Sequence, residues 1–336
     1  MRCKPLVMSI LWLAAATLQG QPPRPAGPPL KIAMIGKSLA NFVFLSAQRG
    51  AEDAARALSQ KHGVAIEVAS LTPTREDAAV QAERVSQAVR DGAKAVLISC
   101  SDAALLTGPI DAAVDAGVAV MTFDSDAPGS KRFAFYGADD ADLGDKVMTD
   151  LAELMGGQGQ VAILAGSPNA PNLRARAEGV RKAASRYKKI EVVDTVNHIE
   201  TPQDAALAVL RVDAARPKLA GWAMVGGWPL FRSSQSASLV AELQERKLKV
   251  VAVDALPDQL NYVERGFVSV LWAQPTYDWG KVGVETIVDK VLLGKSVPSR
   301  LPMELVRVSR QNLGTWIRML KRWGFTGLPD ETVKSP

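Results

Sequence analysis

The sequence predicts an α/β protein made of two doubly wound, parallel-sheet lobes of the Rossmann-like type. Apolar stretches of strand length alternate with stretches of helical periodicity along most of the 336 residues. Two strand-like runs end in the same way, residues 118–123 before Asp124 and residues 248–253 before Asp254, each with a proline shortly after. A chain of this length exceeds the usual size of one hydrophobic core, so two lobes are expected.

The first run of elements follows residues 21–30, a proline-rich stretch that favours an extended tether. A helix is expected from about residue 74, because Ala78, Ala82, Val85 and Val89 form an apolar stripe. The alternation of strands and helices predicts a parallel sheet with helices on both faces. The other predicted elements of this run are strands at 31–36, 64–69, 95–99 and 118–123 and helices at 44–61 and 103–116.

A second run of similar size begins near Gly137. It ends in a helix that contains Trp316, Ile317, Leu320 and Trp323, and we expect this helix to dock on its own lobe rather than on a membrane or partner protein. The predicted helices before it are 139–155, 171–186, 202–214, 231–246 and 277–293, and the predicted strands are 160–165, 190–196, 219–225, 249–253, 267–273 and 303–308.

Residues 1–20 have the pattern of a secretory signal peptide. Arg2 and Lys4 precede an apolar run at 6–16 that is too short to span a bilayer as a stable helix, and small or polar residues follow. The alternative is an N-terminal membrane anchor. Cys3 precedes the apolar run, so it is not the lipid-bearing cysteine of a lipoprotein. We expect removal of the signal between residues 16 and 30 and a periplasmic location, with Cys100 left as a buried, unpaired thiol.

Composition and motifs exclude several classes of function. The formal charge falls from +5 to +3 without Arg2 and Lys4, and no Lys/Arg block remains that favours nucleic acid. His62 and His198, the two histidines of the chain, belong to no metal-binding pattern. Residues 36–38 read Gly-Lys-Ser but lack the glycine that a phosphate-binding loop needs at position 31, and residues 156–159 precede a strand, the wrong context for a dinucleotide site. No Gly-x-Ser-x-Gly motif occurs. We therefore expect no metal, no cofactor and no enzyme.

Six stretches give the chain a resemblance to the periplasmic sugar-binding proteins of the ribose-binding type, the soluble components of bacterial sugar ABC importers. The likeness covers about residues 31–310. The stretches are KSLANFVF (37–44), VMTFDSDAP (120–128), AGSPNAPNLRARAEG (165–179), GWP (227–229), VVAVDALP (250–257) and AQP (273–275).

This resemblance implies a periplasmic binding protein of type I, with two lobes joined by a three-segment hinge. The first lobe is then residues 31–136 plus 275–304 and the second 137–274 plus 305–336. It also implies that a neutral monosaccharide, whether a pentose, hexose, deoxyhexose or polyol, binds between the lobes. The protein is expected to be a monomer that delivers this sugar to an ABC transporter permease in the inner membrane.

The resemblance also assigns residues to the site. Asp124 and Asp254 match the family's sugar-binding aspartates, whose carboxylates accept hydrogen bonds from sugar hydroxyls. Arg174 matches a hydroxyl-donating arginine, with pairing to Glu178 as the alternative. Both aspartates have capping of the following turn as their alternative. The remaining expected ligand-binding residues are Asn41, Phe44, Asp126, Trp228 and Gln274.

Some positions depart from the family pattern. Phe42-Val-Phe44 replaces Pro-Phe-Phe, so one aromatic face is lost. Ser125 stands where an arginine often follows the first aspartate, with Asp126 as a second nearby acid, and glycine at 226 or 227 replaces an asparagine. These changes lie at specificity positions. They argue against ribose itself but not against another neutral sugar or polyol.

Three other functions fit parts of the sequence. The protein could present its ligand to a chemoreceptor or a histidine kinase, which the sequence does not separate from transport. The effector domain of a LacI-type repressor would need an N-terminal helix-turn-helix, and residues 1–30 are an apolar segment plus a proline tether. A sugar-processing enzyme would have to use Asp124, Asp126 and Asp254, and we predict no turnover of sugars.

Overall fold

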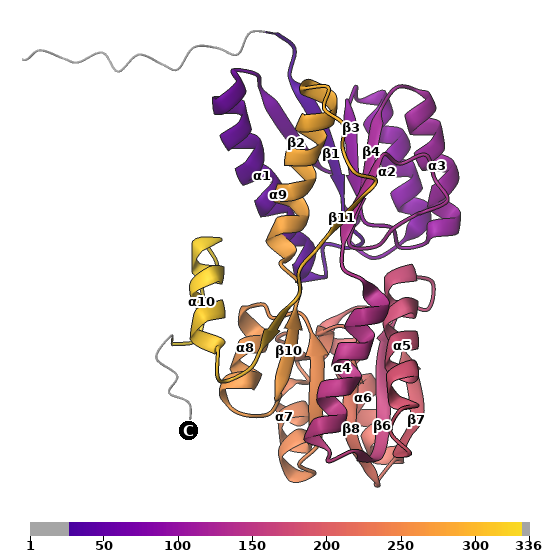
Figure 1. Ribbon diagram of the computed structural model, residues 1–336, viewed down its shortest axis with the longest axis vertical. Helices are drawn as coiled ribbons and strands as arrows, with labels where there is room; N and C mark the ends of the chain where they lie inside the picture. The colour runs from indigo at the N-terminus through magenta and orange to yellow at the C-terminus, as the bar shows by residue number, and fades with distance from the viewer. Residues whose placement is uncertain (1–26, 331–336) are drawn as a thin grey trace, which may run out of the picture.

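The computed structural model describes residues 27–330 as two α/β lobes, each built around a six-stranded sheet (Figure 1). The strand orders are β11-β5-β4-β3-β1-β2 and β12-β10-β9-β8-β6-β7, and every pairing is parallel except that of β10 with β12. The predicted class, two doubly wound lobes, is confirmed. The expected signal peptide, most of the tether and Cys3 lie outside the described residues.

Strands of the first lobe are buried on both faces, which explains why they read as continuous apolar runs. Along β1, Ile32 and Met34 face the core shared with α1 and α9, while Ala33 and Ile35 face the core shared with α2 and α3. Cys100 is fully buried in this second core, as expected. The elements of the first lobe are β1 (Leu30–Ile35), α1 (Phe42–His62), β2 (Ile66–Ser70), α2 (Ala78–Arg90), β3 (Ala95–Ile98), α3 (Ala103–Asp115), β4 (Ala119–Phe123), β5 (Ala134–Gly137), α9 (Thr276–Ile287), a π-helical turn (Val288–Leu292) and β11 (Arg300–Pro302).

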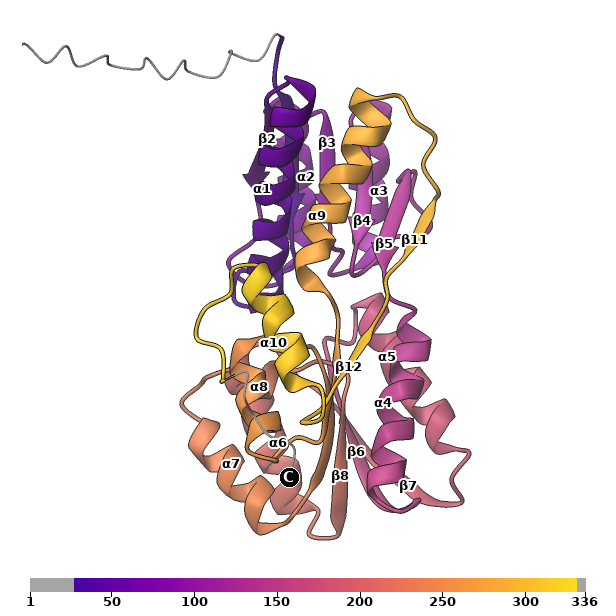
Figure 2. The same cartoon turned by 60° about the vertical axis from the view of Figure 1, so that its left-hand side comes forward.

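The second lobe has the same layered plan. Helices α4 and α5 lie together on one side of its sheet, and α6, α7 and α8 lie on the other (Figure 2). Its elements are α4 (Asp140–Leu154), β6 (Gln158–Gly166), α5 (Pro171–Ala184), β7 (Lys189–Asn197), α6 (Pro202–Ala215), β8 (Leu219–Met224), a 3-10 turn (Trp228–Leu230), α7 (Ser236–Glu245), β9 (Lys249–Val253), α8 (Pro257–Glu264), β10 (Val270–Ala273), β12 (Val306–Val308) and α10 (Leu313–Arg322).

The chain passes between the lobes at three places, after β5, after β10 and after β11. The strands joined by the crossings, β5 and β11 in one sheet and β10 and β12 in the other, are the two outermost strands at one end of each sheet. All three crossings are therefore on the same edge of the molecule. The opposite edge, formed by β2 and β7, has no chain connection. The lobes can therefore rotate about the crossings as a hinge.

Some elements differ from the sequence prediction. The short strand β5 and the helix α8 were not predicted, and the helix expected from residue 231 begins only at Ser236, because the 3-10 turn occupies residues 228–230. Of the strand expected at 303–308, only β12 at its end forms, because the third crossing occupies the residues before it, and the short strand β11 of the other sheet was not predicted. No helix within residues 27–330 is long and apolar enough to cross a membrane.

The C-terminal helix docks on its own lobe, as predicted, and the chain after it also reaches the first lobe. Trp316 Nε1 donates to Ala255 O at 2.7 Å, which ties α10 to the second lobe. Trp323 stacks on Tyr277 of α9 at 5.3 Å between ring centroids, and Arg49 of α1 donates to Gly324 O at 2.7 Å. Residues 323–324 therefore add a non-covalent link between the lobes (Figure 2).

Glycines allow one pair of helices in each lobe to meet backbone to backbone. A Cβ on Gly280 of α9 would lie 1.8 Å from Ala47 O of α1, and a Cβ on Gly144 of α4 would lie 2.0 Å from Arg176 O of α5. Real Cβ atoms do not approach a carbonyl oxygen so closely. Any larger residue at either position must therefore push the helices apart.

We predict that Gly280→Ala lowers the free energy of unfolding by about 1–3 kcal/mol, the usual effect of overpacking. Gly108→Ala is the matched control, because Gly108 lies inside α3 with no atom within 4 Å of an added Cβ. Alanine there is expected to be neutral or to stabilise by up to about 1 kcal/mol. Urea unfolding curves of both variants test this, and equal stability of the two would contradict the close-contact interpretation.

Candidate ligand-binding site

Asp124 and Asp254 occupy equivalent positions at the carboxyl ends of β4 and β9. The N–H of Asp124 donates to Tyr136 O at 3.0 Å, and the N–H of Asp254 donates to Trp272 O at 2.9 Å, so each is tied to the neighbouring strand. Both have left-handed backbones, with φ of 56° and 73°. Aspartate tolerates this conformation better than most residues, and such strain is concentrated at functional sites. The Asp124 carboxylate contacts side chains of both lobes, and the Asp254 carboxylate accepts a hydrogen bond from Gln274.

Asp124 makes contacts with both lobes. Its Oδ2 accepts a 2.8 Å hydrogen bond from Ser99 Oγ of its own lobe, while its Oδ1 accepts a 3.0 Å bond from Asn172 Nδ2 of α5. The Oδ1 atom also lies 3.7 Å from Arg176 Nη2. Asp124 is only 5% exposed, so these contacts are shielded from water.

Arg176 is the cation at the centre of this cluster and is 3% exposed. Its Nε donates to Asp140 Oδ1 at 2.8 Å, and its Nη1 donates to Val225 O at 3.2 Å. Its Nη2 donates to Gln274 Oε1 at 2.9 Å, and Gln274 Nε2 in turn donates to Asp254 Oδ1 at 2.9 Å. A continuous chain of polar contacts therefore joins Asp124 of the first lobe to Asp254 of the second.

The charges of this cluster depend on one another. Burial lowers the pKa of Arg176, but the carboxylates of Asp140, Asp124 and Asp254 outweigh burial and raise it above the ordinary value. Burial raises the pKa of Asp140 to about 6 in spite of Arg176. Burial also raises the pKa of Asp254, against the opposing effects of Arg176 and Gln274. The guanidinium thus opposes the effect of burial on the pKa of Asp140 and of Asp254.

Lys37 completes the central contacts from the first lobe. It follows β1, is 2% exposed, and its Nζ donates to Asn172 Oδ1 at 3.1 Å across the lobes. In the sequence, Lys37 belongs to a failed phosphate-binding motif and to the resemblance stretch at 37–44, but it was not among the expected ligand-binding residues. Its position directly after a buried strand, like that of Asp124, was the available signal for a role in the cleft.

Arg174 lies away from the buried cluster. Arg174 is exposed, and its guanidinium donates to Pro168 O and Asn169 O on the outside of α5. Two positions along a helix correspond to a rotation of about 200°, so Arg174 and Arg176 face opposite ways. Arg176 is therefore the arginine of the cleft.

Two further expected ligand-binding residues lie away from the cluster. Phe44 is 3% exposed and belongs to the first-lobe core, with its ring 6.2 Å from Phe123 and 6.1 Å from Trp279. It is Phe42, on the next face of α1, that reaches the other lobe and contacts Phe231 at 5.2 Å between centroids. Asp126 does not join the cluster either, because it pairs with Arg132 of its own lobe at 2.5 Å.

Asn41 and Trp228 have local partners near the cleft. Asn41 is 8% exposed and caps α1, where its Oδ1 accepts a 3.4 Å hydrogen bond from Val43 N. Trp228 is buried against His198, with 4.8 Å between the ring centroids. A Cβ on Gly226 would lie 2.4 Å from the Trp228 ring, so the indole fills the space that a side chain at 226 would need.

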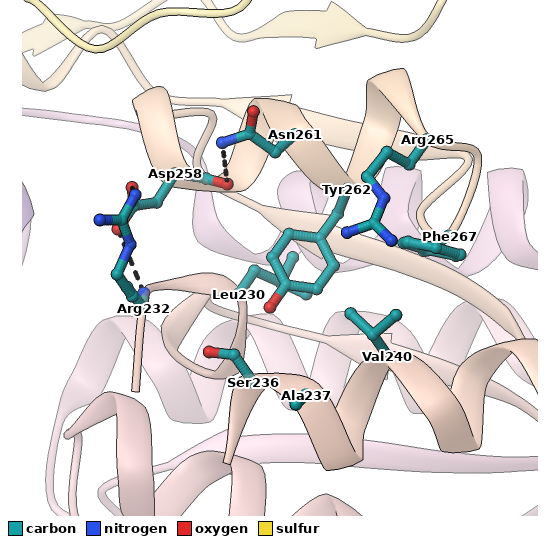
Figure 3. A pocket seen from close by; sticks show the side chains of 10 residues that line it. All are labelled: Leu230, Arg232, Ser236, Ala237, Val240, Asp258, Asn261, Tyr262, Arg265 and Phe267. Atoms are coloured by element: carbon teal, nitrogen blue, oxygen red, sulfur yellow. Dashed lines mark hydrogen bonds and ion pairs between the residues drawn. The ribbon is translucent and has the colours of Figure 1, made fainter. Parts of the chain in front are cut away.

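A hollow of about 390 Å³ lies elsewhere, on the second lobe between α7 and α8 (Figure 3). Its polar groups already have partners: Arg232 N donates to Asp258 Oδ2 at 3.1 Å, and the Arg265 guanidinium lies 4.5 Å from the centre of the Phe267 ring. It contains none of the strand-end residues of either sheet. We therefore place the candidate site between the lobes, where buried ionisable groups converge.

Two doubly wound lobes with three crossings and polar strand ends facing each other define a bilobed binding protein. The chain belongs to the periplasmic binding protein domain family, whose model matches residues 32–296. It is 27% identical over 290 residues to the ribose import binding protein of Escherichia coli (strain K12), a match that covers 83% of this chain and 90% of that protein. The relative from Bacillus subtilis (strain 168) is 24% identical over 315 residues, covering 89% and 95%. The predicted resemblance to the ribose-binding type is confirmed.

Solved structures have the same fold. A solute-binding protein from Burkholderia graminis in complex with D-arabinose matches with a TM-score of 0.74 and 23% identity, covering 84% of this chain and 96% of that one. A solute-binding protein from Agrobacterium vitis bound with α-D-tagatopyranose matches with a TM-score of 0.76 and 22% identity, again covering 84% and 96%.

We predict that Arg176→Met lowers the free energy of unfolding at pH 7 by about 3–5 kcal/mol, because it leaves buried carboxylates without their cation. Arg174→Met is the matched control and should change stability by less than about 0.5 kcal/mol. Arg176 lowers the pKa of Asp140, which is about 6 in its presence, so without Arg176 this carboxyl takes up its proton at a higher pH. The deficit of Arg176→Met should therefore shrink as the pH falls toward about 6. Urea unfolding at several pH values measures both effects, and equal stability of the two variants would contradict the central role of Arg176.

Proposed function

We propose that the protein is a periplasmic solute-binding protein that captures a neutral monosaccharide between its lobes and delivers it to an ABC importer. The single observation that carries this proposal is the buried interlobe cluster of Asp124, Arg176, Gln274 and Asp254. Its carboxylates can accept hydrogen bonds from vicinal hydroxyls, and its guanidinium and amide can donate to them. A pentose, hexose, deoxyhexose or polyol offers hydroxyls that do both.

The relatives support transport over the alternatives. The two relatives described above are import binding proteins by name, and another, the D-allose-binding periplasmic protein of Escherichia coli (strain K12), is 22% identical over 281 residues. On this basis we favour import over sensing and over sugar turnover. We infer that the protein works in the periplasm as a monomer and that its partner is the importer's permease. Asp124, Asp254, Arg176 and Gln274 are the residues that we assign to the sugar.

A thermal-shift screen with D-ribose, D-arabinose, D-allose and D-tagatose tests the ligand class. A ligand at 100 times its dissociation constant stabilises the native state by about 2.7 kcal/mol, which is a clear rise in melting temperature for a protein of this size. We expect at least one sugar to produce it. Acidic and aromatic solutes serve as controls, and a shift with these but with no carbohydrate would overturn the sugar assignment.

Asp124→Asn and Asp254→Asn should each weaken binding of the best sugar about tenfold or more. Loss of one charged acceptor in a desolvated cleft costs about 1.4 kcal/mol or more, which is one decade in affinity. Asparagine is the right replacement because it tolerates the left-handed backbone at both positions. Calorimetric titration measures the effect, with the exposed Asp115→Asn as control. Unchanged affinity in both cleft variants would rule out the interlobe site.

A further inference from the structure

Helix α10 begins in the second lobe and ends against α1 of the first lobe (Figure 2). The match to the family model ends at residue 296, so this helix and the segment after it lie beyond the matched part of the chain. In both views the helix lies to one side of the three crossings (Figures 1 and 2). Contacts between its end and the first lobe are therefore separate from the hinge.

The start of α10 is anchored on the second lobe, next to a residue of the candidate site. Trp316 is buried, and its Nε1 donates to Ala255 O at 2.7 Å. Ala255 directly follows Asp254, so this hydrogen bond ties the helix to the loop after β9. Ile317 and Leu320 lie on the same face of the helix and are fully buried. Helix α10 is therefore a fixed part of the second lobe.

The end of α10 has a fixed shape because it forms a Schellman motif. Gly324 N donates to Lys321 O at 2.8 Å, and Gly324 has the left-handed φ of 75° that this motif requires. Phe325 N donates to Leu320 O at 3.0 Å, which completes the motif. Residues 323–325 are therefore held against the helix and do not form a loose linker.

Trp323 and Gly324 contact the first lobe directly. The Trp323 ring stacks on Tyr277 of α9, with 5.3 Å between the ring centroids and 8° between the ring planes. Tyr277 is held in turn by α1, because its Oη donates to Asp53 Oδ2 at 2.9 Å. Arg49 Nη1 of α1 donates to Gly324 O at 2.7 Å. A Cβ on Gly324 would lie 2.0 Å from Arg49 Nη2, so a side chain at this position would displace the guanidinium.

The two tryptophans connect the first lobe to the candidate site. Trp316 and Trp323 pack edge to face, with 5.8 Å between their ring centroids. A continuous path of contacts therefore leads from Tyr277, through both indoles, to the carbonyl of Ala255. The loop that follows Asp254 is thereby linked to the opposite lobe by side chains outside the cleft.

Phe325 lines an apolar hollow that both lobes form. The hollow has a volume of about 320 Å³, and its lining includes Phe42 of the first lobe and Phe231 of the second. The rings of Phe42 and Phe231 are 5.2 Å apart. Separation of the lobes would expose the apolar surfaces that meet here to water, which costs free energy.

We propose that residues 313–325 are a C-terminal latch that holds the two lobes together when no ligand is bound. A rotation about the crossings leaves in place only the contacts on its axis, and the latch lies to one side of the crossings. Opening therefore breaks the stack on Tyr277 and the hydrogen bond from Arg49. Contacts that exist in the closed form alone shift the equilibrium toward that form.

The latch should raise the affinity for the sugar, a consequence that rests on the proposed function. The apparent dissociation constant is the intrinsic constant divided by the fraction of protein in the binding-competent form, here the closed one. We expect Trp323→Leu, which loses the stack, and Arg49→Met, which loses the hydrogen bond, each to weaken binding about threefold to tenfold.

Small-angle X-ray scattering of the full chain tests the latch without any ligand, because opening of the lobes increases the radius of gyration. We expect Trp323→Leu and Tyr277→Leu each to increase it, and the double variant to increase it no further, since both changes remove one stack. Tyr277→Phe keeps the ring and should match the wild type. Phe267→Leu, which loses an aromatic contact within the second lobe, is the matched control and should also match it.

Calorimetric titration with the tightest of D-ribose, D-arabinose, D-allose and D-tagatose measures the affinities. Arg318→Met is the matched control for Arg49→Met, because Arg318 is exposed and bonds only within α10 to Thr315. Melting curves show whether each variant is folded, and Gly324→Ala, which displaces Arg49, replaces a variant that is not.

The scattering result decides the latch, and the titration decides the function. A wild-type radius of gyration in the ligand-free Trp323→Leu and Tyr277→Leu variants would overturn the latch, whichever sugar binds. A larger radius in these two variants, with wild-type values for Tyr277→Phe and Phe267→Leu, is the expected result. Failure of all four sugars to bind the wild type would overturn the proposed function, and the ligand-free scattering would still decide the latch.

Discussion

The buried guanidinium of Arg176 is the interaction on which the rest of the cleft depends. Removing an ion from water costs several kcal/mol, and only a full set of partners offsets this. Arg176 has such a set, in which Asp140, Gln274 and the carbonyl of Val225 belong to the second lobe and Asp124 belongs to the first. Since one carboxylate comes from the other lobe, the compensation is complete only when the lobes are together. The charge of Arg176 thereby couples the buried residues between the lobes to the position of the hinge.

The backbone around Arg176 leaves the side chain little freedom. Gly144 of α4 lies directly against the carbonyl of residue 176, so α5 is fixed against α4 at the level of the guanidinium. Asp140, at the start of α4, then lies beside Nε, immediately after the first crossing. The first lobe fixes Asp124 in a comparable way, through the left-handed turn after β4 and the hydrogen bond from Ser99. Helices and strand ends thus fix the positions of Arg176, Asp140 and Asp124 within their lobes, and the lobes can rotate about the crossings.

The sequence predicted both lobes and both strand-end aspartates because buried parallel strands leave a strong local pattern. The choice between Arg174 and Arg176 needed the phase of a helix. Arg176 lies on the same face of α5 as Leu173, Ala177 and Val180, which are all buried. The apolar stripe of this helix therefore indicated that Arg176, and not Arg174, faces inward. Placing Phe44 in the core needed the packing of α9, a segment more than two hundred residues away. The hydrogen bond of Lys37 to Asn172 had no sequence signal, because its two residues come from different lobes.

Contacts between the lobes act in opposite directions in the absence of a ligand. The bonds of Asn172 to Asp124 and Lys37 favour closure, as do the contact of Phe42 with Phe231 and the stacking of Trp323 on Tyr277. Glu76 acts against closure, because burial and then the charge of Glu200 raise the pKa of its carboxyl group. A ligand can shift this equilibrium only by as much as it binds one state better than the other. A ligand that contacts residues of both lobes can do so only when the lobes are together, so the free energy of those contacts favours the closed state.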